Sequence, residues 1–313
     1  MAQFPEEQTD EGEFNRQEDE FRDLVSTTAG AVHPAESGRY HLYISLACPW
    51  AHRTLITRHL RGLEDAVSVT VVNPVRDERG WAFGDGPGYS HDEVNGFHFL
   101  AEAYKASKRL FTGRVTVPVL WDKKAKCIVN NSEDDICRMF QDAFGGLAAK
   151  EVDLFPEDIA GEQQELSQFI YERVNNGVYR AGFASQQRPY EKAAHTLFEA
   201  LDVLEERLAT RRYLFGSRFV ETDWRLFCTL IRFDAVYHGH FKCNVRRIVD
   251  YPNLFGFLRD LYQQPGIADT VNFDHIKRHY YITHDDINPT RIVPIGPDLS
   301  ALKTPSGREA LAD

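Results

Sequence analysis

Residues 40–53 read YHLYISLACPWAHR, and this stretch decides the fold of the first half of the chain. Its opening residues have the aromatic and branched composition of a strand, and Pro49 suits a first helical turn, where its missing N–H would be unsatisfied anyway. Cys48 therefore lies where a strand gives way to a helix. Unpaired N–H groups and the positive end of the helix dipole favour a thiolate there. We expect Cys48 to be reactive, although burial without reactivity is the more common fate of a lone cysteine.

The position one helical turn after Cys48 is Ala51, where a dithiol oxidoreductase would carry a second, resolving cysteine. A mixed disulfide at Cys48 must therefore be resolved by a thiol from another molecule, which predicts a small soluble thiol as cosubstrate. The five cysteines are scattered and lack metal-ligand spacing, so neither a disulfide framework nor a metal site is expected. They are Cys48, Cys127, Cys137, Cys228 and Cys243.

The elements around Cys48 predict a thioredoxin-like domain. We expect a strand at 40–45, a helix at 49–62, a strand at 67–72, a hairpin of 115–122 with 127–131, and a helix at 134–144. Pro118 lies inside an apolar strand pattern, where proline requires an edge or an unusual geometry such as a cis bond. In a thioredoxin-like domain a cis proline faces the nucleophile.

The second half of the chain is predicted to be all-α, so the fold class is α/β plus all-α. Helices are expected at 161–175, 189–211, 221–237, 253–263 and 273–281. The predicted organisation is an N-terminal arm (1–36), a thiol-binding domain (37–147) with an insertion at 74–112, a linker (148–158), a helical domain (159–265), and a C-terminal helix and tail (266–313).

Composition excludes several classes of function. A formal net charge of −11 argues against a general nucleic-acid binder, which needs a basic face. No stretch approaches 18 consecutive apolar residues, and the acidic, polar start is unlike a secretory or transit peptide. We therefore expect a cytoplasmic protein with neither a membrane nor a nucleic acid as partner.

Six strings in the sequence carry a resemblance to a known family: CPWAHR (48–53), GRVTVPVLWD (113–122), NNGVYRAGFA (175–184), LIRFD (230–234), FKCN (241–244) and HIKRHYY (275–281). They resemble the glutathionyl-hydroquinone reductases, which are also called Xi-class glutathione transferases. The strings follow the family order over nearly the whole chain after the arm. The resemblance implies a thioredoxin-like domain followed by a helical transferase domain, with the C-terminal segment completing the substrate site, and a homodimer.

The resemblance also implies a reaction. Cys48 would attack the sulfur of a glutathionyl-hydroquinone, a small aromatic thioether, and would release the hydroquinone. A second glutathione would then reduce the Cys48–glutathione disulfide. Tyr179 and Tyr280 match tyrosines credited with the region of the aromatic ring, where a phenol can donate the required proton. Tyr281, next to Tyr280, is expected to be structural.

The same resemblance assigns a binding site for glutathione. Trp81 would cover the tripeptide, and Val117 would offer its backbone N–H and C=O to the cysteinyl part. Arg114 is a candidate for pairing with a ligand carboxylate, because a guanidinium binds a carboxylate bidentately. A solvated hairpin residue is an equally good reading of Arg114.

The helix that holds the γ-glutamyl group departs from the family pattern. The family usually has Asn-Asn-Glu-Ser-Ser-Glu-Ile, whereas residues 130–136 read NNSEDDI, so that Ser132 and Glu133 exchange the family's order. A carboxylate at Glu133 would repel a ligand carboxylate. Either a small shift places Ser132 on that carboxylate, which we favour because helix-start amides bind anions, or the cosubstrate is another low-molecular-weight thiol.

A second departure is Val220, where the family commonly has a capping threonine; without that cap the helix could start at Thr222 instead.

Two other functions remain open from the sequence. One is a general cysteine-type thiol transferase or dehydroascorbate-like reductase that acts on mixed disulfides. The other is a non-enzymatic binding or assembly module on a transferase fold, because a fold does not by itself fix a function.

Overall fold

The computed structural model describes residues 7, 9, 12–14 and 17–311, and these form two compact units. The sheet unit contains residues 17–153 together with 274–279. The helical unit contains the described residues before Gln17, residues 154–273 and residues 280–311. Parts of the predicted arm, and the last two residues of the tail, lie outside the described residues.

The sheet of the sheet unit has the predicted thioredoxin-like topology. Within the described residues its four strands follow the order β2-β1-β3-β4. β1 pairs in parallel with β2, with Tyr40 opposite Val67, whereas β3 runs antiparallel to both β1 and β4. The strands are β1 (Tyr40–Ile44), β2 (Val67–Val71), β3 (Val119–Asp122) and β4 (Cys127–Asn130).

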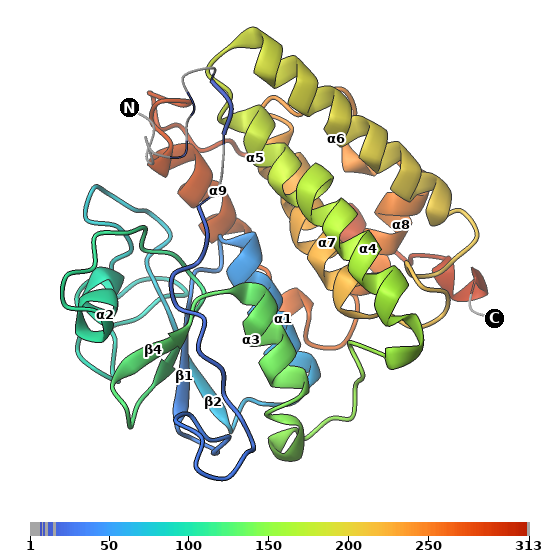
Figure 1. Ribbon diagram of the computed structural model, residues 1–313. Coiled ribbons are helices and arrows are strands. Elements are labelled where there is room, and N and C mark those ends of the chain that lie inside the picture. The colour runs from blue at the N-terminus through green and yellow to red at the C-terminus, as the bar shows by residue number, and fades with distance from the viewer. Residues whose placement is uncertain (1–6, 8, 10–11, 15–16, 312–313) are drawn as a thin grey trace. The chain divides into compact units, whose positions relative to one another are not determined.

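Helices cover both faces of this sheet (Figure 1). α1 (Pro49–Leu60) and α3 (Glu133–Gln141) lie together on one face, and α2 (Leu100–Ser107) packs beside β4 on the other. α1 begins at Pro49, as the sequence predicts. α2 lies inside the insertion at 74–112, where no helix was expected.

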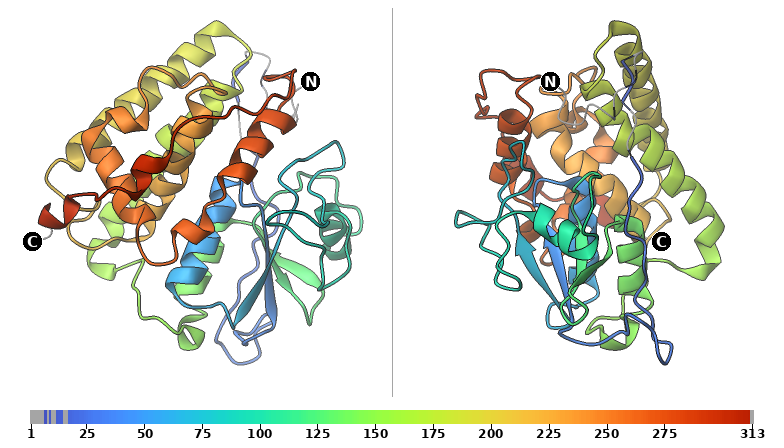
Figure 2. Two further views of the ribbon diagram at one scale, coloured as in Figure 1. Left: turned by 180° about the vertical axis from the view of Figure 1, so that it is seen from behind. Right: turned by 60° about the vertical axis from the view of Figure 1, so that its left-hand side comes forward.

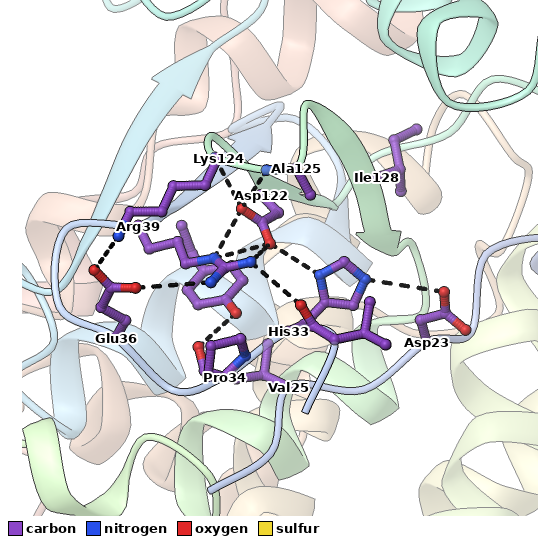
Figure 3. A network of polar contacts seen from close by, with 12 residues as sticks. Asp23, Val25, His33, Pro34, Glu36, Arg39, Asp122, Lys124, Ala125 and Ile128 are labelled. Carbon is purple, nitrogen blue, oxygen red and sulfur yellow. Dashed lines mark hydrogen bonds and ion pairs between the residues drawn. The ribbon is translucent and has the colours of Figure 1, made fainter. Parts of the chain in front are cut away.

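The segment before β1 is fastened to the sheet by a buried carboxylate (Figure 3). Asp122, at the end of β3, is fully buried and accepts hydrogen bonds from the Arg39 guanidinium and from Nδ1 of His33 at 2.9 Å. The N–H groups of Lys124 and Ala125 also donate to Asp122, at 2.9 and 3.0 Å. Burial alone would raise the pKa of Asp122, but these donors outweigh it and lower the pKa to about 2.

The helical unit consists of α-helices, and two of these helices continue into π-helical turns. The π-helical turn η4 (Tyr171–Asn175) joins α4 to α5, and η5 (Phe233–Tyr237) continues α7. The predictions of single helices at 161–175 and 221–237 did not foresee these turns or the helix α5. The helices are α4 (Ala160–Ile170), α5 (Asn176–Gly182), α6 (Gln187–Arg207), α7 (Glu221–Arg232), α8 (Pro252–Tyr262) and α9 (Phe273–Thr283). Residues 274–279 of α9 belong to the sheet unit.

The start of α7 corrects one expectation. The helix begins at Glu221 with Val220 as its N-cap residue, so the alternative start at Thr222 is wrong. Valine has no side-chain acceptor, but the carboxylate of Asp223 reaches back and accepts the N–H groups of Val220 and Leu214, both at 2.8 Å. One half of a capping box therefore stabilises this helix start.

The segment after α9 follows the helical unit as a mostly extended chain (Figure 2). It is fastened to α8, because the side chain of Gln263 donates to the carbonyls of Leu302 and Thr304, at 2.8 and 2.7 Å. Among the residues that the structure describes, no helix is long and apolar enough to cross a membrane.

Candidate active site

Cys48 occupies the N-cap position of α1. Its backbone is extended (φ −77°, ψ 122°), and the first turn closes when the N–H of His52 donates to the Cys48 carbonyl at 3.0 Å. The thiol lies 3.6 Å from the carbonyl oxygen of Val117, and the Val117–Pro118 peptide bond is cis. The predicted neighbours Cys48, Val117 and Pro118 thus meet at one point, and the unusual geometry predicted for Pro118 is confirmed.

α1 and α3 run parallel, and their N-termini lie at the same end. Arg53 of α1 contacts the first residues of α3, with Nη1 3.5 Å from Glu133 and Nη2 2.6 Å from Asp134. Four residues further along both helices, the hydroxyl of Thr57 lies 3.3 Å from the sulfur of Cys137. The positive ends of two helix dipoles therefore point the same way, which favours anions at this end of the pair.

Ser132 and Glu133 have different environments at the start of α3. Ser132 is the N-cap residue, and its hydroxyl accepts the N–H of Asp135 at 3.5 Å. Glu133 is only 3% exposed and lies beside the guanidinium of Arg53. The exchange of serine and glutamate therefore places the hydroxyl at the helix cap and the carboxylate next to a cation.

A hydrogen-bond network that the sequence did not predict supports the loop before Pro118. The hydroxyl of Tyr104, on α2, donates to the carbonyl of Thr116 at 2.9 Å and accepts the Thr116 N–H at 3.1 Å. The side-chain amide of Asn131 donates to the Thr116 hydroxyl at 3.1 Å. Burial raises the pKa of Tyr104 to about 12, so this phenol stays neutral. The insertion thus holds the loop that approaches Cys48.

Trp81 and Arg114, the other predicted thiol-binding residues, also belong to the sheet unit. Trp81 is buried, stacks on the ring of His279 with centroids 5.0 Å apart, and lies beneath the guanidinium of Arg76 at 4.8 Å. His279 is held in turn by the Pro74 carbonyl, 2.7 Å from Nδ1. Arg114 is half-buried, three residues before Val117.

Tyr179 and Tyr280 meet in the helical unit, where their hydroxyl groups share a hydrogen bond. Tyr237, which the sequence did not single out, lies 3.0 Å from the same Tyr280 hydroxyl. The ring of Phe241 packs against all three tyrosines. A Cβ atom on Gly182 would lie 2.2 Å from the Phe241 ring, so glycine is required for this packing.

The described residues contain no candidate metal site. No group of three or more histidine, cysteine or acidic side chains is placed to hold a metal ion within residues 17–311 and the few described residues before them. All five cysteines are described, and none forms a disulfide.

Family models match both halves of the chain. The model of the N-terminal domain of glutathione S-transferases matches residues 47–143, and the model of their C-terminal domain matches residues 187–260. Fold and site together define a protein of the glutathione transferase class.

Curated relatives and solved structures narrow this class. The chain is 51% identical over 306 residues to the glutathionyl-hydroquinone reductase YqjG of Escherichia coli, covering 95% of this chain and 93% of the relative. It is 48% identical over 286 residues to the glutathionyl-hydroquinone reductase PcpF of Sphingobium chlorophenolicum, covering 91% and 90%.

Among solved structures, a Xi-class transferase from Natrialba magadii has a TM-score of 0.91 at 51% identity, with coverage of 93% of this chain and 89% of that one. The glutathione-bound structure of YqjG from Escherichia coli has a TM-score of 0.89 at 51% identity, with coverage of 92% and 96%. The chain belongs to the glutathionyl-hydroquinone reductases, the Xi class of glutathione transferases, as its sequence predicts.

Proposed function

We propose that this chain removes glutathione from glutathionyl-hydroquinones, with Cys48 as the nucleophile. The observation that carries the proposal is the position of Cys48 at the start of α1, 3.6 Å from the Val117 carbonyl on the cis-proline loop. Two curated relatives at about half identity carry the name glutathionyl-hydroquinone reductase. A thiol at a helix start beside a second parallel helix is suited to react as a thiolate.

The proposed reaction has two steps that balance without a metal or an added oxidant. The Cys48 thiolate attacks the sulfur of the conjugate, the aryl carbon–sulfur bond breaks, and the aromatic carbon takes a proton from Tyr179 or Tyr280. A second glutathione then attacks the glutathione sulfur of the mixed disulfide and releases Cys48. The sum converts the conjugate and glutathione into hydroquinone and glutathione disulfide. Because residue 51 is alanine, the second thiol must come from outside the chain.

For the thiol we propose glutathione, bound near Trp81, Arg114, Val117, Ser132 and Glu133. The structure of YqjG was solved with glutathione bound. In this chain the Arg53 guanidinium lies beside Glu133, which offsets the repulsion between that carboxylate and a ligand carboxylate. Comparing the kcat/KM of glutathione with those of cysteine and γ-glutamylcysteine would identify the preferred thiol, and a preference for either of the latter would replace glutathione in the proposal.

The decisive experiment combines the menadione–glutathione conjugate with glutathione and measures the released hydroquinone. Cys48→Ala should abolish release, whereas Cys127→Ala, at the other half-buried cysteine, should leave it intact. Mass spectrometry of the wild-type protein should show one glutathione on Cys48. Release of hydroquinone by Cys48→Ala at the wild-type rate would disprove the proposed nucleophile.

The same variants test the two alternatives. A general thiol transferase would reduce a mixed disulfide faster than it cleaves the aryl thioether, and Tyr179→Phe and Tyr280→Phe would slow neither reaction selectively. In the proposed reductase these tyrosine variants lose activity with the thioether alone. A non-enzymatic module would form no glutathione adduct and would release no hydroquinone.

We further propose a cytoplasmic homodimer. A catalytic thiol resolved by a reduced small thiol requires a reducing compartment, and the resemblance to the family implies pairing of two chains. Sedimentation equilibrium should give twice the mass of 35.9 kDa, and a monomer at micromolar concentration would contradict the dimer.

A further inference from the structure

Three tyrosine hydroxyls gather inside the helical unit. The Tyr280 hydroxyl lies within hydrogen-bond distance of the Tyr179 hydroxyl and 3.0 Å from that of Tyr237. The exposed fraction falls from 9% at Tyr179 to 1% at Tyr280 and 0% at Tyr237. Tyr179 is therefore the least buried of the three hydrogen-bonded phenols, and Tyr237 is the most buried.

A π-helical turn fixes Tyr237 at the buried end. The N–H of His238 donates to the carbonyl of Phe233, five residues earlier, at 2.8 Å, so Tyr237 is the last residue of a turn that is one residue wider than an α-helical turn. Its ring stacks on Phe241 (5.5 Å, 15°) and meets the Tyr280 ring edge-on (5.5 Å, 86°). These contacts hold the Tyr237 hydroxyl against Tyr280. In proteins generally, π-helical turns occur frequently at functional sites.

Each phenol hydroxyl has one proton to donate, so the hydrogen bonds that link three phenols all run in one direction. If Tyr237 donates to Tyr280, and Tyr280 donates to Tyr179, the hydroxyl proton of Tyr179 is left to donate to a group outside the three phenols. If the hydrogen bonds ran in the opposite order, Tyr179 would use its proton on Tyr280. A reaction that takes a proton from Tyr179 therefore requires Tyr237, at the other end of the series, to be a donor.

We propose that Tyr237 is a positioning residue for proton donation by Tyr179, acting through Tyr280. This inference rests on the proposed reductase function and goes beyond it by assigning the order of the phenols. Tyr179 gives its proton to the aromatic carbon as the carbon–sulfur bond breaks, and its oxygen keeps the negative charge. The hydrogen bond from Tyr280, strengthened by the one from Tyr237, stabilises that charge. The second glutathione, which reacts as a thiolate, supplies the proton that restores Tyr179.

The surroundings of Tyr237 keep it neutral, as a donor must be. Burial and the neighbouring Tyr280 raise the pKa of Tyr237 well above its ordinary value, although Arg232 and a hydrogen bond with Tyr179 oppose this. His240 and His284 lie near the Tyr280 ring, with centroids 6.4 and 5.4 Å away. Burial lowers the pKa of His240 to about 4, so this histidine carries no charge at neutral pH.

The test is Tyr237→Phe, which keeps the ring and removes only the hydroxyl. With the menadione–glutathione conjugate, kcat should fall about tenfold while KM stays unchanged, because Tyr237 acts through Tyr280 and does not itself touch the substrate. The alkaline limb of the kcat profile should move to higher pH by about one pH unit, since the Tyr179 phenolate loses stabilisation. Reduction of a mixed disulfide, which needs no proton on carbon, should continue at the wild-type rate and will show that the variant is folded.

The matched control is Tyr281→Phe, which removes the neighbouring hydroxyl on α9. That hydroxyl donates to the Ala235 carbonyl, at 3.4 Å, and its loss should leave kcat and the pH profile unchanged. Site-specific 3-fluorotyrosine in place of Tyr237 is a stronger hydrogen-bond donor and should move the alkaline limb to lower pH.

The outcomes separate the inference from the proposed function. If the wild-type protein releases no hydroquinone, the proposed function fails and the inference fails with it. If the wild type is active and Tyr237→Phe keeps both its kcat and its alkaline limb, the inference alone is overturned. An increase in KM with unchanged kcat would also overturn it, because that result would place Tyr237 in substrate binding.

Discussion

The contact between Arg53 and Glu133 is the part of the proposed thiol site where energies can be worked out most directly. The side chains of Arg53 and Glu133 are each 4% exposed, whereas Asp134, the other acid on Arg53, is 50% exposed. Removing one partner of a buried ion pair costs about 3 to 5 kcal/mol, whereas a pair with an exposed partner contributes about 0 to 1 kcal/mol. Arg53→Met should therefore lower the free energy of unfolding by about 3 kcal/mol, and Asp134→Asn by less than about 1 kcal/mol.

A double-mutant cycle isolates the pair. Arg53→Met leaves the Glu133 carboxylate buried without this cation, and Glu133→Gln removes that charge. The free energy of unfolding of the double variant should therefore be about 1 to 3 kcal/mol higher than the sum of the two single changes predicts. Urea unfolding of the four proteins at one pH measures the cycle, with Asp134→Asn as the control for an exposed carboxylate. The KM for glutathione should also rise severalfold in Arg53→Met, because the start of α3 loses its contact with α1. If the cycle closes to within about 0.5 kcal/mol of additivity, the pair does not hold the two helix starts together.

Three further predictions concern stability. Val220→Thr should raise the free energy of unfolding by about 0.5 to 1 kcal/mol at unchanged kcat, because the hydroxyl of the introduced threonine would complete the capping box of α7. A lower melting temperature would contradict this. Burial lowers the pKa of His41 from 6.5 to about 3, so unfolding should become easier as the pH falls below about 6.5, by about 1.4 kcal/mol per pH unit, and His41→Asn should flatten that slope. Gly182→Ala forces a methyl group onto the Phe241 ring and should cost about 1 to 3 kcal/mol; a variant as stable as wild type would show that the ring yields freely.

Short-range sequence signals predicted the surroundings of Cys48. Cys48 followed by Pro49 indicated a helix start, and Pro118 within an apolar strand indicated the unusual peptide bond; both predictions depend on backbone chemistry that neighbouring residues determine. Family strings supplied Tyr179 and Tyr280, which local physics could not distinguish from the other eleven tyrosines.

The elements that escaped prediction depend on contacts between distant segments. α2 is eight residues long and lies in a glycine-rich insertion, yet its Tyr104 holds the Thr116 backbone twelve positions later. The π-helical turn before α5 is supported from α7, where the Arg225 carbonyl and the Thr229 hydroxyl accept the side-chain amide of Asn175. A periodic pattern assumes constant α-helical geometry, so it cannot predict where a wider turn redirects the side chains that follow.

Contacts between distant residues also change how the exchanged Ser132 and Glu133 are interpreted. The sequence alone indicates three successive acids at the start of α3, an arrangement that would repel an anionic ligand. In the structure Arg53 contacts Glu133 and Asp134, and Arg22 contacts Asp135, while the helix dipole favours negative charge at this end. The acids are therefore largely compensated before any thiol binds. Two groups at the start of α3 can still meet a ligand: the half-exposed Asp134 carboxylate can attract an ammonium group, and the Ser132 hydroxyl can donate to a carboxylate. We therefore expect the site to select a thiol that carries both groups on one carbon, which a thiol without an amino group could not replace.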